Sequence, residues 1–212
     1  MPIDKNTETC YNAAMKNKTK HTNGIKVLFT DFDGVLNNDK EFLRWRSTQD
    51  HEGLPCGCTE VNECIDPMNV EQLNRVIRET GCEIVVSSTW REFFSNEWLT
   101  AHLKKFGFIG EIKYRTKNTE RGGWGNRSLR CDEIRHWLQN SGIKVDRYAI
   151  VDDLEEADTG EGRFVMTFDK HGLRKQEADK IIALLNDSQD FVTNFNNLSQ
   201  GNQDEFRTNS GQ

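Results

Sequence analysis

The chain contains no apolar run that approaches the ~20 residues needed to span a bilayer. Segment 1–24 is polar and lacks the apolar stretch of a secretory signal. We therefore expect no membrane association and a cytoplasmic location. In that compartment the six cysteines are expected to be free thiols rather than disulfides.

The chain also has no excess of basic residues. It contains 28 Lys and Arg against 34 Asp and Glu, which gives a formal net charge of -6. This balance argues against a broad basic surface for duplex nucleic acid, although it leaves room for a local basic patch. Acidic residues gathered at one site would also suit a bound metal ion.

Hydrophobic residues account for only 35% of the 212 residues, a low fraction for a compact domain. Segments 1–24 and 188–212 are polar and show no sustained period. We interpret both as disordered tails around one folded domain at residues 25–187.

Strand and helix patterns alternate within this domain. Short apolar runs predict strands at 25–30, 83–87, 148–151 and 163–167. Apolar residues at helical spacing predict helices between the strands, for example from Pro67 to a stop at Gly81. The alternation predicts an α/β fold with a Rossmann-like parallel sheet and helices on both faces. Residues 37–65 are too long for a simple loop and are expected to form a small cap inserted after the first strand.

Polar side chains follow three of the predicted strands. Ligands bind outside the carboxyl ends of the strands in open parallel sheets, so the residues at these positions are candidates for a site. They are Asp31 and Asp33, Ser87 and Ser88, and Asp152 and Asp153. A solvated turn is the simpler explanation of Asp-x-Asp-Gly alone, but the coincidence of three strand ends favours a shared site.

The residue types at these ends indicate phosphate chemistry with a metal ion. Asp31 and Asp33 point to the same side if the chain stays extended, and two such carboxylates repel each other unless a cation intervenes. Mg²⁺ takes oxygen ligands and shares them with substrate phosphate, and Asp152 can supply a further ligand. One carboxylate can attack phosphorus while the other handles the proton of the leaving group.

Three of these segments resemble motifs of the haloacid dehalogenase (HAD) superfamily. Asp-Phe-Asp-Gly-Val-Leu at 31–36 is similar to the first motif, Ile-Val-Val-Ser at 84–87 to the second, and Tyr-Ala-Ile-Val-Asp-Asp at 148–153 to the fourth. Further short segments resemble the HAD domain found in Swiss Army Knife RNA repair proteins, with a similarity from about 26 to 186. These include Asp66-Pro67, Ser87-Ser88-Thr89-Trp90-Arg91, Arg130 with Glu133-Ile134, and Gly172-Leu173.

The resemblance implies a role for each strand-end residue. Asp31 is implied to be the nucleophile that forms an aspartyl-phosphate and also a metal ligand. Asp33 is implied to be the general acid and base, with its backbone carbonyl facing the metal. Ser87 is implied to hydrogen-bond the phosphoryl group, and Asp152 to bind Mg²⁺ with help from Asp153. The implied reaction is phosphomonoester hydrolysis, with a terminal phosphate on RNA or a nucleotide as the substrate.

The third motif is a basic residue that offsets phosphoryl charge. Arg130 is favoured because it precedes Asp-Glu-Ile at a helix start, and Lys117, Arg121 and Arg127 remain alternatives. Other activities also remain open: a small-metabolite phosphatase, a phosphotransferase, or a silent HAD fold used for binding.

Two further residues near the second motif are candidates for substrate binding. Arg91 could reach a substrate phosphate, or it could form a structural ion pair. Ser88 could be a second phosphate ligand or a hydroxyl that starts a loop. The thiols at Cys56, Cys58 and Cys64 could hold a zinc ion, but their spacing is unusual and unpaired thiols in a small insertion are the simpler interpretation. The oligomeric state stays open.

Overall fold

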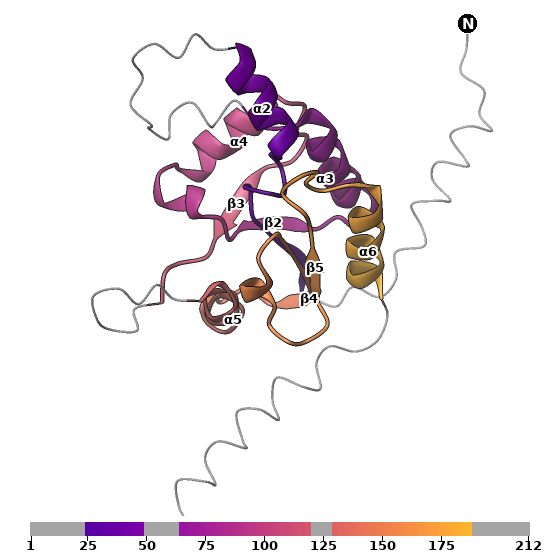
Figure 1. Cartoon of the computed structure of the whole chain (residues 1–212). Helices are drawn as coiled ribbons and strands as arrows, with labels where there is room; N and C mark the ends of the chain where they lie inside the picture. Colours follow the sequence, from indigo (N-terminus) through magenta and orange to yellow (C-terminus); the bar gives the residue numbers. More distant parts are fainter. Residues whose placement is uncertain (1–23, 49–63, 120–128, 188–212) are drawn as a thin grey trace, which may run out of the picture.

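The protein forms an open sheet of five parallel strands (Figure 1). The computed structural model describes residues 24–48, 64–119 and 129–187, so most of both predicted tails lies outside it. The strands are β1 (Ile25–Thr30), β2 (Glu83–Val86), β3 (Ile112–Arg115), β4 (Val145–Asp152) and β5 (Phe164–Met166), in the spatial order β3-β2-β1-β4-β5. The predicted parallel α/β sheet is confirmed. The edge strand β3 was not predicted, because its four residues form no continuous apolar run.

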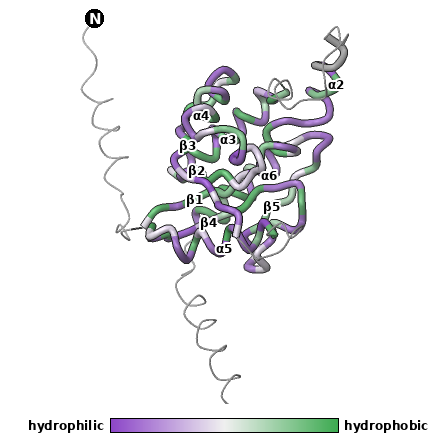
Figure 2. Tube along the Cα trace, turned by 90° about the vertical axis from the view of Figure 1, so that its left-hand side faces the viewer, coloured by the Kyte–Doolittle hydropathy of each residue, from purple (hydrophilic) through white to green (hydrophobic). Residues whose placement is uncertain are grey.

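Helices cover both faces of the sheet, as predicted. The covering helices are α3 (Pro67–Thr80), α4 (Asn96–Lys104), α5 (Arg130–Asn140) and α6 (Lys175–Asn186). The described residues also form α2 (Asp39–Thr48), in the segment after β1, and two short 3₁₀ turns, η2 (Thr89–Glu92) and η3 (Glu155–Ala157). One core joins Leu28 of β1 to α3, α4 and α6, and a second core joins Phe29 to α5 on the opposite face. Figure 2 shows hydrophobic segments of β1 and β4 between these layers. Because both faces of the sheet are covered by helices, the central strands β1 and β2 consist largely of consecutive apolar residues.

The boundaries of α3 follow from its capping residues. Asp66 accepts a hydrogen bond from the Met68 amide at 2.8 Å, and Pro67 opens the helix where no amide hydrogen is required. Gly81 ends it in the left-handed conformation and donates its N–H to Ile77. Both ends match the prediction from the sequence.

The two ends of the segment between β1 and α3 lie side by side. Asn37 and Ile65 form an isolated antiparallel bridge, and the Asp66 amide donates to the Leu36 carbonyl at 2.8 Å. Helix α2 lies within this segment, and residues 49–63 are outside the described ranges. Among the described helices, none has the length and apolar character of a membrane-crossing segment.

Candidate active site

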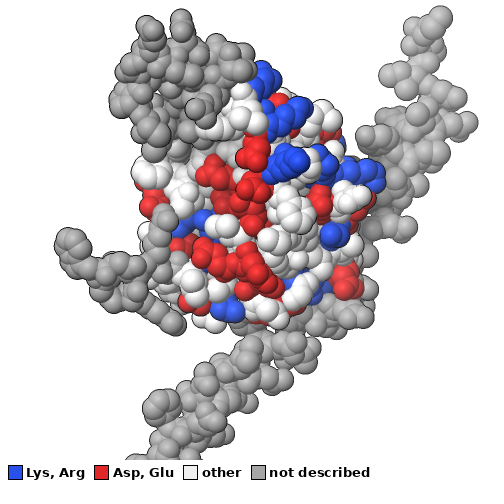
Figure 3. Space-filling view, in the orientation of Figure 1, with Lys and Arg blue, Asp and Glu red and all other residues white. Residues whose placement is uncertain are grey.

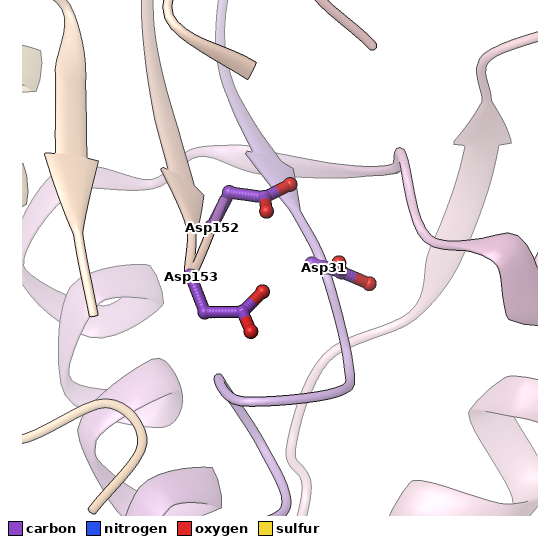
Figure 4. Close-up of side chains that lie close together, drawn as sticks. All are labelled: Asp31, Asp152 and Asp153. Atoms are coloured by element: carbon purple, nitrogen blue, oxygen red, sulfur yellow. The ribbon is translucent and has the colours of Figure 1, made fainter. Parts of the chain in front are cut away.

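Three carboxylates meet where β1 and β4 end (Figure 4). Asp31, Asp152 and Asp153 each offer one oxygen, and these oxygens lie within 4.8 Å of one another. The register that pairs Thr30 with Val151 places Asp31 beside the end of β4. The order β3-β2-β1-β4-β5 makes this the point where the chain switches direction across the sheet, which is where open α/β sheets bind ligands. The structure thus brings together three of the four predicted metal ligands.

Arg130 lies between two of these carboxylates. Its Nη1 donates to Asp31 Oδ2, and to Asp152 Oδ2 at 2.9 Å. Burial alone lowers the pKa of Arg130, but the charges of Asp31 and Asp152 outweigh it and raise that pKa above its usual value. Burial, and then the charge of Asp31, raise the pKa of Asp152. The first residue of α5 therefore supplies a permanent cation to the cluster.

Among the described residues, Arg130 is the one candidate for the third motif that contacts Asp31. Lys117 follows β3, is exposed, and does not line the cavity that contains Asp31. Arg121 and Arg127 lie outside the described ranges. The contacts of Arg130 support its choice.

Asp33 lies beside the three-carboxylate cluster, and its carboxylate is not among the oxygens that form it. Its Oδ1 accepts a hydrogen bond from Asn37 Nδ2 at 2.7 Å, and its Oδ2 accepts one from Trp90 Nε1 at 3.0 Å. Burial raises the pKa of Asp33 and the charge of Asp31 adds to this, while the two hydrogen bonds lower it; the net shift is upward. A carboxyl that is readily protonated suits an acid that donates a proton to a leaving group.

The two serines after β2 differ in what their hydroxyls contact. Ser87 is fully buried, and its Oγ has no hydrogen-bond partner among the described residues. Ser88 Oγ accepts from the Trp90 amide at 3.3 Å and caps η2. Ser87 therefore has a hydroxyl to offer a ligand, whereas the contact of Ser88 matches the loop-starting alternative.

Arg91 has mainly structural contacts. Its Nη1 donates to the carbonyls of Ser87 and Ser88 at 2.9 and 2.7 Å, and its Nη2 donates to Asn118 at 2.8 Å and Glu133 at 2.6 Å. A guanidinium has five N–H donors, so four are already engaged. The structure favours the ion-pair alternative over the predicted contact between Arg91 and substrate.

A cavity of about 430 Å³ opens onto these residues. Its lining includes six carboxylates, those of Asp31, Asp33, Glu92, Glu133, Asp153 and Glu156, and two guanidiniums, those of Arg91 and Arg130. Figure 3 shows acidic side chains gathered at the centre of this face. A phosphate dianion would be repelled here unless a cation shared the carboxylate oxygens.

The family model for the HAD domain in Swiss Army Knife RNA repair proteins matches residues 27–178. The chain belongs to this family. Its HAD domain is thus related to phosphatase-type hydrolases, and the match covers most of β1, the other four strands and the described site. No curated protein matches the chain.

The first turn of the HAD domain after β1 requires glycine. Gly34 has a φ of 66°, and a Cβ at this position would lie 2.6 Å from the carboxyl carbon of Asp153. Its carbonyl accepts a hydrogen bond from Thr167 Oγ1 at 2.9 Å. The turn thereby places Asp153 close to the backbone of the first motif.

Sequence reasoning missed the supporting residues of this HAD site. Asn37 and Trp90 orient Asp33, and Glu133 holds Arg91. Trp90 and Glu133 fall within segments that carry the family resemblance, but no local pattern indicates which distant residue each contacts.

The thiols considered for zinc gain no structural support. Cys56 and Cys58 lie outside the described residues, and Cys64 is buried. Among the described residues, the acidic cluster of the HAD site is the one group that could hold a metal ion.

Proposed function

We propose that the protein is a Mg²⁺-dependent phosphomonoester hydrolase that acts through an aspartyl-phosphate on Asp31. The observation that carries this proposal is the meeting of Asp31, Asp152 and Asp153, whose oxygens lie within 4.8 Å of one another, with Arg130 donating to two of them. Family membership supports a phosphatase-type reaction.

The residues at the site fit a magnesium ion. Three carboxylate oxygens lie within 4.8 Å of one another, and hard oxygen ligands are those that Mg²⁺ prefers. The proposed ligands are Asp31, Asp152 and Asp153, together with the backbone carbonyl of Asp33. When bound, Mg²⁺ would supply positive charge that offsets the repulsion between these carboxylates and a substrate phosphate.

In the first step a carboxylate oxygen of Asp31 attacks phosphorus. The new O–P bond forms as the bond between phosphorus and the leaving oxygen breaks. Asp33 donates its proton to that oxygen, so the alcohol leaves neutral. The raised pKa of Asp33 supports this role because it makes the carboxyl easier to protonate than an ordinary aspartate.

In the second step water attacks the phosphorus of the aspartyl-phosphate. The bond between phosphorus and the Asp31 oxygen breaks, and inorganic phosphate leaves. Asp33, now a carboxylate, takes the proton from the attacking water, which restores both residues. Arg130 and the Ser87 hydroxyl stabilise the charge of the phosphoryl oxygens in both steps.

For the substrate, we propose a terminal phosphate on RNA or on a nucleotide. The support is the family match, whose description refers to RNA repair proteins. The alternative is a small-metabolite phosphatase or phosphotransferase, and a silent binding module is the third possibility. Both predicted catalytic carboxylates, Asp31 and Asp33, are present at the site, which disfavours the silent module.

A substrate panel tests the proposal. Release of inorganic phosphate is measured with Mg²⁺ for 3′- and 5′-phosphorylated oligoribonucleotides, nucleoside monophosphates, sugar phosphates and p-nitrophenyl phosphate. We expect the highest kcat/KM on the oligoribonucleotides and no turnover by Asp31→Asn. Turnover of sugar phosphates alone contradicts the RNA-end substrate, and no turnover of any ester contradicts the phosphatase activity.

A further inference from the structure

A second cavity, which we call the basic cavity, lies where α2, α3 and α6 begin. Its volume is about 410 Å³. Its charged lining consists of the cationic side chains of Lys40, Lys170, Arg174 and Lys175 and the single carboxylate of Asp66, with His171 beside them. Figure 3 shows basic side chains next to the acidic centre of the same face. The basic cavity is thus opposite in charge to the active site.

The carboxylate of Asp66 in the basic cavity already accepts two hydrogen bonds from neighbouring residues. Asp66 Oδ1 accepts from the Met68 amide, and Oδ2 accepts from Asn38 Nδ2, each at 2.8 Å. Among the described residues, Lys170 and Arg174 form no ion pair. Their positive charges are therefore available to an external anion.

The backbone adds to this positive potential. Helix α3, of 14 residues, and helix α6, of 12 residues, both begin at the basic cavity. The N-terminus of a helix carries a partial positive charge and favours anions. Asn69 lies in the first turn of α3 and lines the cavity, but it is 3% exposed and its buried Nδ2 packs beside Gly172, so it adds no donor for a ligand. Two helix ends thus meet at one place with four cations, of which Lys40 and Lys175 are paired with Glu41 and Asp179, whereas Lys170 and Arg174 form no ion pair among the described residues.

The basic cavity and the active site share one loop. The segment that follows β1 contributes Asp33 to the active-site cavity and Asn38 to the basic cavity. Five residues span at most about 18 Å, which limits the distance between these two positions. A nucleic-acid strand that advances about 3.4 Å per nucleotide covers that span in roughly five nucleotides.

We propose that the basic cavity binds an internal phosphate of a single-stranded polynucleotide whose terminal phosphate lies at Asp31. This inference rests on the proposed function, because it assumes that the terminal phosphate is hydrolysed at the acidic site. It explains how a chain of net charge -6 holds a polyanion: the contacts to the backbone are concentrated at one cavity. The proposed contact also favours binding of a polynucleotide over a mononucleotide, because a mononucleotide has no internal phosphate to place in the basic cavity.

Binding is measured first, with the Asp31→Asn protein so that no turnover interferes. Fluorescence anisotropy of a labelled single-stranded oligoribonucleotide of about ten nucleotides is followed over a range of KCl concentrations. Adding Lys170→Gln and Arg174→Gln should weaken binding roughly tenfold and lower the slope of log K against log salt by about 0.7, the value for one phosphate contact. The matched control is Lys104→Gln with Lys105→Gln, which removes the same charge from exposed positions outside the cavity. Equal affinities and slopes for the two double variants overturn the proposal.

Kinetics on the otherwise wild-type enzyme separate the inference from the proposed function. The Lys170→Gln and Arg174→Gln variant should keep kcat/KM for p-nitrophenyl phosphate and for a nucleoside monophosphate, which also shows that it is folded. Its kcat/KM for a 5′- or 3′-phosphorylated oligoribonucleotide should fall roughly tenfold. Equal losses on the mononucleotide and the oligonucleotide assign the cavity to free phosphate groups and overturn the proposal. If the wild-type enzyme hydrolyses none of these esters, the proposed function fails, while the anisotropy experiment still decides whether the cavity binds a strand.

Discussion

Trp90 donates its indole N–H to the carboxylate of Asp33, with 3.0 Å between Nε1 and Oδ2. The second oxygen of Asp33 accepts a hydrogen bond from Asn37 at 2.7 Å. The indole ring packs against Phe32, with 5.1 Å between ring centroids. The proposed general acid is therefore oriented by residues that come from both the first and the second motif segments.

Replacing Trp90 by Phe removes the indole N–H and keeps an aromatic ring. Loss of one hydrogen bond to a charged group, about 1.5 kcal/mol, should lower kcat about tenfold for an alkyl phosphate. A dinitrophenyl phosphate needs little help from an acid because its leaving group is already a stable anion, so its kcat should change little. Steady-state kinetics on both esters measure the difference.

The control for this variant is Trp98→Phe. Trp98 stacks on Phe94 and His102, and its ring is part of the same aromatic group without a hydrogen bond to Asp33. Trp98→Phe should leave the ratio of kcat for the alkyl phosphate to kcat for the dinitrophenyl phosphate unchanged. Equal losses on both esters in Trp90→Phe would mean that Trp90 only supports the fold.

Gly34→Ala should disturb the metal site. A Cβ at Gly34 falls 2.6 Å from the Asp153 carboxyl carbon, whereas a Cβ at Gly160, with φ 75°, meets nothing within 4 Å. Both alanine variants should lose about 1–2 kcal/mol of unfolding free energy in urea, because both place a side chain in the left-handed region. Gly34→Ala alone should raise the Mg²⁺ concentration that gives half-maximal activity. Equal Mg²⁺ dependence in the two variants would contradict the placement of Asp153 beside the metal.

Arg91→Met should reduce stability rather than substrate affinity. The side chains of Arg91 and Glu133 are 5% and 4% exposed and lie 2.6 Å apart, so the variant breaks a buried ion pair. We expect a loss of about 3–5 kcal/mol in urea unfolding, partly recovered when Glu133→Leu is added. A raised KM with unchanged stability would instead support the predicted contact with substrate.

Mg²⁺ should stabilise the folded protein against heat. A ligand at about 100 times its Kd adds about 2.7 kcal/mol to the free energy of unfolding. The rise in Tm should disappear in Asp152→Asn, which removes a carboxylate of the cluster, and should persist in Glu156→Gln, which lines the same cavity outside the cluster. A Tm rise of the same size in Asp152→Asn would place the ion elsewhere.

The main residues of the site follow from the sequence because parallel strands end at one edge of a sheet. The β1–β4 register brings Asp31 beside Asp152, and the Ser87 amide donates to the Thr30 carbonyl at 3.0 Å, which places the second motif next to the first. The choice of Arg130 depended on the family resemblance, and its contacts with Asp31 and Asp152 agree with it.

The supporting contacts could not be predicted in the same way. Trp90 and Asp33 are separated by 57 positions, and Arg91 and Glu133 by 42. Their meeting depends on side-chain directions in the packed fold, which no local periodicity specifies. The basic cavity is a similar case, because Lys40 of α2 and Lys170, which lies between β5 and α6, are brought to one cavity only in the folded chain.

The central claim is that Asp31 carries the phosphoryl group during turnover. Its most direct test is to mix the enzyme with Mg²⁺ and a substrate labelled with ³²P in the hydrolysed phosphate, quench in acid within a single turnover, and map the labelled peptide. We predict a hydroxylamine-labile label on the peptide that contains Asp31, and none in Asp31→Asn. Turnover by Asp31→Asn at the wild-type rate, or a label on a different residue, would contradict the account.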